Sequence, residues 1–197
     1  MNRVGEHVQK PASAAPMRDV ASSAAAAPMA FPAEFQLLRR SLGDDAASPA
    51  LTGSLREAGF HMGETLYTRF GDWLSLRGDS VPEQLSEDAF ATLVGEFFEV
   101  YGWGHISIAP LTEGIMVLDA TDWCEARAGG KHCLVSTGVF SGFFGRFADA
   151  PIAVMEVECS ASGHPHCRFL LSAEQTLRRV HDAMLRGVTY ANATRQE

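Results

Sequence analysis

Residues 152–172 read IAVMEVECSASGHPHCRFLLS, and this stretch decides the second half of the fold. Apolar and β-branched residues dominate both of its ends, whereas Gly, Pro and Ser gather in the middle. The pattern predicts two strands, over 152–158 and 167–172, that a turn at 160–166 folds into an antiparallel hairpin. A cysteine lies where each strand meets the turn, so we expect the hairpin to bring two thiols together. These are Cys159 and Cys167.

The other periodic segments predict a second hairpin and several helices. Residues 105–110 and 114–120 are expected to form strands joined by a turn at 111–113. Apolar residues that repeat at steps of three and four predict helices over 31–42, 49–78, 86–101, 134–147 and 173–185. Helices, a hairpin, a helix, a hairpin and a helix in this order are typical of an α+β domain, with an antiparallel sheet packed against several helices.

Two of the predicted helices contain glycines at helical spacing. Gly59 and Gly63 lie four residues apart in the first, and Gly138, Gly142 and Gly145 follow one side of the second. A glycine inside a helix destabilises it by about 1 kcal/mol relative to alanine. We therefore expect these positions to allow close packing against another element.

Composition and charge restrict the classes of function. The chain has 197 residues, 46% of them hydrophobic and 20% charged, which is typical of one globular domain with a core. The formal net charge of −8 argues against a nonspecific nucleic-acid or anionic-membrane binder, because both need clustered Lys and Arg. No apolar run approaches the roughly 18–20 residues that a membrane span needs. Neither nucleic acid nor a membrane span is therefore expected.

The first 32 residues differ from the rest. They contain nine Ala, four Pro and three Ser, and have too few large apolar residues to offset the entropy of ordering. Polar and charged residues interrupt every stretch that a secretory signal would need, so a cytoplasmic protein is expected. The predicted organisation is a disordered Ala/Pro-rich tail over 1–32, a single domain over 33–190 and a short tail over 191–197.

The four cysteines are Cys124, Cys133, Cys159 and Cys167. In a reducing cytosol such a set is more typical of a metal site than of disulfides. Cys133 precedes the predicted helix at 134–147, where the positive end of the helix dipole favours a thiolate. Zinc takes four tetrahedral ligands drawn from Cys, His and carboxylate.

Spacing alone leaves the ligand set open. The step of eight residues from Cys159 to Cys167 differs from the short gap of a zinc finger. Three buried structural cysteines, or disulfides, are the alternatives to a metal site. The candidates for a fourth ligand are Glu156, Glu158, His164 and His166.

Five segments carry motifs that point to a known family. They are Tyr101-Gly102-Trp103-Gly104, Asp122-Trp123-Cys124-Glu125-Ala126, His132-Cys133, Thr137-Gly138 to Ser141-Gly142-Phe143-Phe144, and Val154-Met155-Glu156-Val157-Glu158-Cys159 through Gly163-His164-Pro165-His166-Cys167-Arg168-Phe169. Together they resemble the 4-vinyl-reductase domain family, which shares a fold with TRAPP vesicle-tethering subunits and haem nitric-oxide-binding domains. The resemblance is strong from Trp103 to Leu171 and holds only in outline upstream.

The resemblance also implies a ligand set. Zinc-containing members use a Cys, then a Glu, then two Cys, and these steps fall on Cys133, Glu156, Cys159 and Cys167. Four protein ligands leave no open position for substrate, so the implied Zn²⁺ is structural. Cys124 lies outside this set.

The fold implied by the resemblance has an apolar pocket between its helices and its sheet. Phenol-sensing relatives hold the phenol hydroxyl with a Trp shortly before the segment that matches 122–125, and residues 117–121 contain no Trp. The missing Trp counts against phenol, and the expected ligand is an apolar or aromatic small molecule, with tetrapyrroles among the candidates. The predicted lining residues are Phe97, Tyr101, Trp103, Ile108, Val117, Phe140, Phe144 and Met155.

Three functions follow from these expectations. The first is a zinc-stabilised sensor or carrier of a small molecule, and the second is a protein of bacteriochlorophyll synthesis that acts on or holds a vinyl tetrapyrrole. The third is a scaffold that only dimerises. No Gly-rich nucleotide fingerprint follows a predicted strand, and no nucleophile–base arrangement is evident, so binding is favoured over catalysis. A homodimer is expected because Phe35, Leu38 and Leu42 form an apolar stripe.

Overall fold

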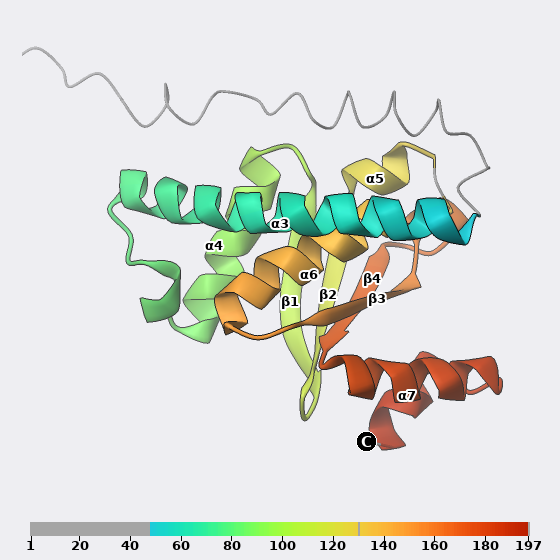
Figure 1. Ribbon diagram of the computed structural model, residues 1–197. Coiled ribbons are helices and arrows are strands. Elements are labelled where there is room, and N and C mark those ends of the chain that lie inside the picture. Colours follow the sequence, from blue (N-terminus) through green and yellow to red (C-terminus); the bar gives the residue numbers. More distant parts are fainter. Residues whose placement is uncertain (1–47, 130, 197) are drawn as a thin grey trace, which may run out of the picture.

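A computed structural model describes residues 48–129 and 131–196. The predicted tail over 1–32 and the predicted helix over 31–42, with its stripe of Phe35, Leu38 and Leu42, lie outside the described residues. Within them, Figure 1 shows a central sheet between a layer of longer helices and a smaller C-terminal layer.

The sheet is antiparallel and has four strands in the order β1-β2-β4-β3. The two predicted hairpins therefore lie side by side and join where β2 pairs with β4. The predicted α+β class with an antiparallel sheet is confirmed. The strands are β1 (His105–Thr112), β2 (Ile115–Thr121), β3 (Ala153–Glu158) and β4 (Cys167–Ser172).

Helices cover both faces of the sheet. On one face lie α4 (Glu87–Val100) and α6 (Leu134–Ala148), and α3 (Pro49–Arg77) crosses over α6 (Figure 1). On the other face lie α7 (Glu174–Leu185) and the short α8 (Tyr190–Ala193). The predicted helices at 49–78, 86–101, 134–147 and 173–185 are confirmed to within two residues. The remaining short elements are α5 (Cys124–Arg127), η2 (Pro82–Gln84), η3 (Ser160–Ser162) and η4 (Thr194–Gln196).

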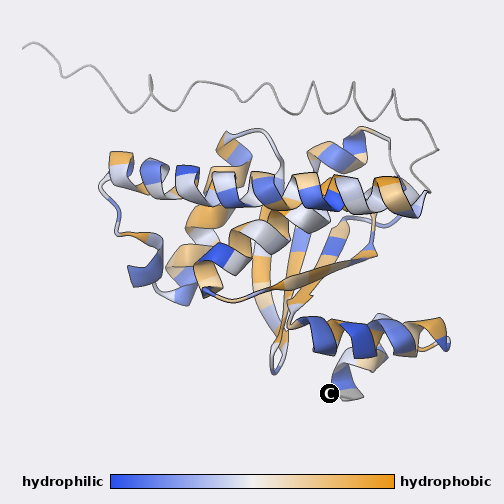
Figure 2. Ribbon diagram, viewed as in Figure 1, coloured by the Kyte–Doolittle hydropathy of each residue, from blue (hydrophilic) through white to orange (hydrophobic). Residues whose placement is uncertain are grey.

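Side-chain alternation along the strands divides the apolar residues between two cores. On β2, Leu118 and Ala120 join the core under α4 and α6, whereas Val117 packs with the core under α7. In Figure 2 the strands are mostly apolar, and α7 carries many polar residues. This division determines on which side of the sheet each candidate residue lies.

The predicted close packing of glycines is confirmed between α3 and α6 for four of the five positions, but not for Gly145, where the nearest atom to an added Cβ lies 3.4 Å away. A Cβ at Gly59 or Gly63 would overlap backbone carbonyl oxygens of α6, and one at Gly138 or Gly142 would overlap those of α3. The two helix backbones therefore touch where they cross. The contact fixes the position of α6, whose first residue follows Cys133.

The C-terminal segment differs from the expectation of a tail over 191–197. Residues 190–196 form α8 and η4, and Ala193 and Thr194 are buried. The short length of α8 and its lack of an apolar period explain why the pattern missed it. Among the described helices, none is both long and apolar enough to cross a bilayer.

Candidate metal centre

Three separate elements bring the predicted ligands together. Cys133 is the residue before the first turn of α6, Glu156 lies on β3, and Cys159 and Cys167 lie where the β3–β4 hairpin meets its turn. One ligand atom from each of the four residues lies within 4.8 Å of every other. We call these four residues the Cys–Glu cluster. Such a cluster could hold a metal ion.

The sulfur atoms have the spacing of a tetrahedral site. The Sγ of Cys133 lies 3.9 Å from that of Cys159 and 3.7 Å from that of Cys167, and the last two are 4.0 Å apart. Tetrahedral zinc with bonds of about 2.3 Å separates its sulfur ligands by about 3.8 Å. Because disulfide sulfurs would lie about 2.05 Å apart, these distances describe free thiols around a common point.

Glu156 offers the cluster a carboxylate oxygen. Its side chain is only 8% exposed, and its Oε2 accepts a 2.9 Å hydrogen bond from the backbone N–H of Cys133. His132 approaches the same oxygen from the surface, at 3.5 Å. The other oxygen, Oε1, is buried and has no hydrogen-bond partner among the described residues. A buried carboxylate oxygen without a donor is costly, and a cation would satisfy it.

Without an ion, the three thiols cannot all ionise. Hydrogen bonds from Cys133 and Cys159 lower the pKa of Cys167 to about 2. The pKa of Cys133 is instead raised, by its hydrogen bonds with Cys159 and Cys167 and by burial. For Cys159 the bond with Cys133 acts downward, but the bond with Cys167 and burial outweigh it and raise the pKa to about 12. The cluster therefore holds one thiolate that its neighbours share. A divalent cation is the group that would allow all three to ionise.

N–H and O–H donors surround the cluster, as a site with excess negative charge requires. The backbone N–H and the hydroxyl of Ser160 lie 3.4 and 3.3 Å from the Sγ of Cys167. The positive end of the α6 dipole points at Cys133. Three thiolates and one carboxylate around Zn²⁺ carry a net charge of about −2, which these donors would stabilise.

Sequence reasoning assigned no role to Glu125, which the structure places at the start of α6. Its buried carboxylate accepts hydrogen bonds from the backbone N–H groups of Val135 and Ser136, at 3.0 and 2.7 Å. The Ser136 hydroxyl donates to it as well and accepts a 2.7 Å bond from the Trp123 ring nitrogen. Glu125 thus caps α6 and fixes the first turn beside Cys133. Its place in the 122–126 motif was the available signal.

The other predicted candidates lie away from the cluster. Glu158 and His166 lie on the α7 side of the sheet, close to Asp119, and His164 is exposed in the turn. Cys124 is fully buried in α5, and burial raises its pKa to about 12. Of the residues that the structure describes, only Cys133, Glu156, Cys159 and Cys167 form a group that could hold a metal ion.

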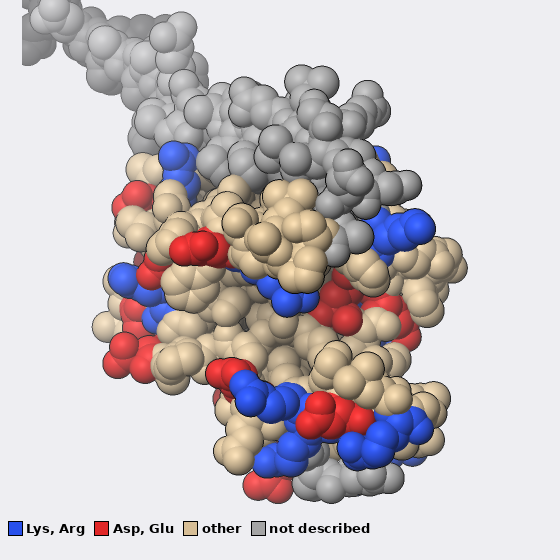
Figure 3. Space-filling model, turned by 45° about the vertical axis from the view of Figure 1, so that its right-hand side comes forward, with Lys and Arg blue, Asp and Glu red and all other residues tan. Residues whose placement is uncertain are grey.

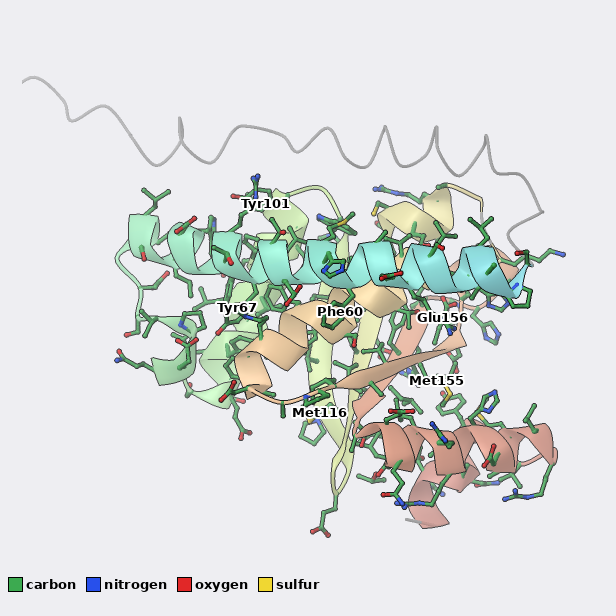
Figure 4. All side chains as sticks on the ribbon, in the orientation of Figure 1. Phe60, Tyr67, Tyr101, Met116, Met155 and Glu156 are labelled. Carbon is green, nitrogen blue, oxygen red and sulfur yellow. The ribbon has the colours of Figure 1, made fainter. Side chains whose placement is uncertain are left out.

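The eight predicted pocket residues divide between the two cores. Six belong to the core under α4 and α6, where the rings contact one another: Phe97 and Tyr101 at 4.6 Å, and Phe140 and Phe144 at 6.3 Å between centroids. Val117 and Met155 pack instead under α7, so the expectation that they line the same pocket is wrong. In Figure 4, Met155 lies toward α7, below its neighbour Glu156.

Two hollows lie along α6 on the side of Phe60, which Figure 4 shows between α3 and α6. Their volumes are about 230 and 330 Å³, and Phe60 and Ser141 line both. None of the eight predicted residues lines either of them. Figure 3 shows mainly uncharged surface between the layer of α3 and the mixed charges of α7.

The fold and the cluster define a class of protein: an α+β domain in which a helix start and a strand hairpin present three thiols and one carboxylate to a common point. Residues 121–173 match the V4R domain model. This segment contains the whole Cys–Glu cluster, and the resemblance to the vinyl-4-reductase family is confirmed over it. A comparison with curated protein sequences gives no match.

Three solved structures are similar to the chain. The phenol-responsive sensory domain of the transcription activator PoxR, with phenol, has a TM-score of 0.55 and 19% identity and covers 72% of this chain and 73% of its own. A trafficking protein particle complex subunit 3 from Naegleria fowleri, covalently bound to palmitic acid, has a TM-score of 0.52 and 12% identity and covers 77% and 95%. A vinyl-4-reductase family protein from Methanocaldococcus jannaschii has a TM-score of 0.47 and 16% identity and covers 74% and 80%. The first two show that the fold is shared.

Proposed function

We propose that this protein is a zinc-stabilised domain that binds an apolar or aromatic small molecule, as a sensor or a carrier. The proposal of a zinc site is supported by the Cys–Glu cluster, whose sulfur atoms are 3.7–4.0 Å apart and whose buried carboxylate oxygen lacks a hydrogen-bond donor. The small-molecule part is supported by the shared fold with a phenol-bound sensory domain and a palmitate-bound subunit.

The proposed role of the ion is structural. Cys133, Glu156, Cys159 and Cys167 together fill a tetrahedral shell, which leaves no position for a substrate or a reactive water. When bound, the ion supplies a cross-link between the start of α6 and the β3–β4 hairpin. The chain itself provides the N–H donors and the Glu125 cap that orient this shell. A reducing compartment such as the cytosol, which we expect for this protein, would keep the thiols available.

The proposed ligand site lies in the core between the sheet and the α4–α6 layer. Six of the predicted lining residues lie there: Phe97, Tyr101, Trp103, Ile108, Phe140 and Phe144. Because aromatic rings already fill this region, a ligand would enter by displacing rings at the edge. Tyr101 and Ile108 are the half-buried members and therefore mark the proposed entrance.

The test uses the zinc-loaded protein and Trp fluorescence, because Trp103 and Trp123 both lie in this core. Phenol, a longer fatty acid and a vinyl tetrapyrrole are titrated separately. We expect saturable quenching by one class, and a Tyr101→Ala variant that weakens this binding while leaving the zinc content unchanged. If none of the three changes the fluorescence of the folded, zinc-loaded protein, ligand binding is contradicted.

A second candidate follows from the V4R match, namely a protein that holds or acts on a vinyl tetrapyrrole in bacteriochlorophyll synthesis. A shift in the absorption spectrum of the tetrapyrrole on mixing favours this function over a general carrier. The glycines of α6 give no support to nucleotide-dependent reduction, because Gly138 and Gly142 serve the contact with α3. A ligand-free homodimer in sedimentation would favour the scaffold function.

A further inference from the structure

A chain of charged and polar side chains lies on the sheet face opposite the Cys–Glu cluster. Arg168 on β4 donates to both carboxylate oxygens of Asp119 on β2, at 2.6 and 2.7 Å. It also donates to the Tyr190 hydroxyl of α8 at 3.0 Å, and this hydroxyl donates to Glu158 of β3 at 2.7 Å. We call Asp119, Arg168, Glu158 and Tyr190 the polar ladder. It joins three adjacent strands to the C-terminal helix.

The residues of the polar ladder are next to the metal ligands along the strands. Arg168 directly follows Cys167, and successive residues of a strand point to opposite faces. Asp119 pairs with Arg168 in the register, next to the pair of Ala120 and Cys167. The polar ladder therefore lies on the opposite face of the sheet, directly behind the strand residues that carry the metal ligands.

An irregularity in β3 connects the ladder to Glu156 and Cys159. The pairing of β3 with β4 shifts between Glu156 and Glu158, so that Val157 is an extra residue in the strand. Strict alternation would place Glu156 and Glu158 on the same face. The bulge instead sends Glu156 to the cluster and Glu158 to Tyr190.

We propose that Tyr190 and Arg168 are positioning residues for the metal centre, which hold the β3 bulge in the register that lets Glu156 and Cys159 reach the ion. This inference rests on the proposed zinc site. Tyr190 reaches the site from α8, beyond the matched segment 121–173. The C-terminal helix and the metal centre are thereby coupled through one hydroxyl, one carboxylate and one strand bulge.

Loss of the Tyr190 hydroxyl should affect the metal centre because it leaves the Glu158 carboxylate without its hydrogen-bond donor. Its side chain is 17% exposed, and Tyr190 is the hydrogen-bond donor to its Oε1. Without that hydroxyl, the carboxylate gains by turning toward water, and the bulge that it anchors becomes free to slip. A slip by one residue would move Glu156 away from the cluster.

The test is the rate at which an excess of chelator removes zinc from the full-length protein. Tyr190→Phe keeps the ring and removes the hydroxyl. The matched control is Tyr67→Phe, which removes a similar bond, from Tyr67 to Glu83 at 2.5 Å, on the other side of the molecule. We expect Tyr190→Phe to lose zinc roughly three- to tenfold faster than the wild type, the range for one net hydrogen bond. Tyr67→Phe should match the wild type.

A second pair of variants separates hydrogen bonding from packing. Glu158→Gln keeps an oxygen that accepts from Tyr190, and it should release zinc at nearly the wild-type rate, whereas Glu158→Ala should release it faster. If Tyr190→Phe loses zinc at the wild-type rate, or if Tyr67→Phe loses it as fast as Tyr190→Phe does, the inference is overturned while the zinc site stands. A wild-type protein that holds no zinc overturns both the inference and the proposed function.

Discussion

All four cysteines are buried, but they occupy two different environments. Cys133, Cys159 and Cys167 face one another and Glu156, whereas Cys124 lies outside the cluster in α5. Burial alone would make all four behave as small apolar residues. Their surroundings therefore decide which of them are ligands, and this difference can be tested one sulfur at a time.

Cys159→Ser should abolish stoichiometric zinc, because the hydroxyl does not replace a thiolate ligand. With the cross-link lost, the melting temperature should fall by about 10 °C or more. Cys124→Ser is the control, since it changes a buried thiol outside the cluster. Elemental analysis and thermal melts of both variants make the comparison. Retention of zinc by Cys159→Ser would contradict the assignment.

Binding of zinc to the apo protein should release protons. The pKa of Cys133 is raised by its bonds to the other two thiols, and that of Cys159 is raised to about 12, so both hold protons at neutral pH. Cys167, with a pKa lowered to about 2, has already lost its proton. We expect the thiols to release about two protons per ion, and hence weaker binding as the pH falls. Calorimetry in buffers of different ionisation enthalpy measures this number, and a value of zero would contradict the ligand set.

Sequence spacing alone did not select the fourth ligand. With strict alternation, Glu156 and Glu158 share a face and are equivalent candidates. The bulge at Val157 separates them, and its register shift depends on pairing with β4. The family resemblance named Glu156 without this information. Glu125 was missed for a similar reason, because only the folded chain brings α5 to the start of α6.

Among the contacts between helices, the crossing of α3 and α6 leaves the least room for added side-chain atoms. Gly63→Ala should lower the free energy of unfolding by about 3 kcal/mol or more, because a Cβ there overlaps the backbone of α6 at Val139. Gly71→Ala in the same helix has no atom within 4 Å of the new Cβ, and should raise stability by about 0.5–1 kcal/mol. Urea denaturation measures both. Equal effects in the two variants would rule out the close crossing.

Element boundaries were largely predictable, and the exceptions have physical reasons. The side-chain oxygens of Ser48 and Ser86 cap α3 and α4 by accepting hydrogen bonds from backbone N–H groups, and Gly78 ends α3 with a φ of 79°. These are local signals that a sequence carries. Tyr190, at the start of α8, is held by a hydrogen bond to Glu158 on strand β3. This partner is 32 residues away in the sequence, so no local sequence pattern could indicate it. The position of α8 therefore required the fold.

The same limit applies to the predicted pocket. Periodicity identified apolar residues, but the face of the sheet on which each lies depends on the strand register. Val117 and Leu118 are neighbours in sequence and belong to different cores. Only the assembled sheet shows that Val117 and Met155 pack under α7.

For the whole molecule, zinc should be a large part of the stability. Structural zinc in small peptides contributes roughly 10–16 kcal/mol, and whole domains are stable by only about 5–15 kcal/mol. Chelation should therefore loosen the β3–β4 hairpin and the start of α6 before the ring-filled core under α4. Hydrogen exchange with and without chelator should show this order. Uniform protection in both states would contradict a cross-linking role.

X-ray absorption at the zinc edge of the purified protein would show whether three thiolates and one carboxylate converge on one zinc ion. We expect about one zinc per chain, with three sulfur neighbours near 2.3 Å and one oxygen near 2.0–2.2 Å. Absence of zinc, or a shell of nitrogen and oxygen without sulfur, would contradict it.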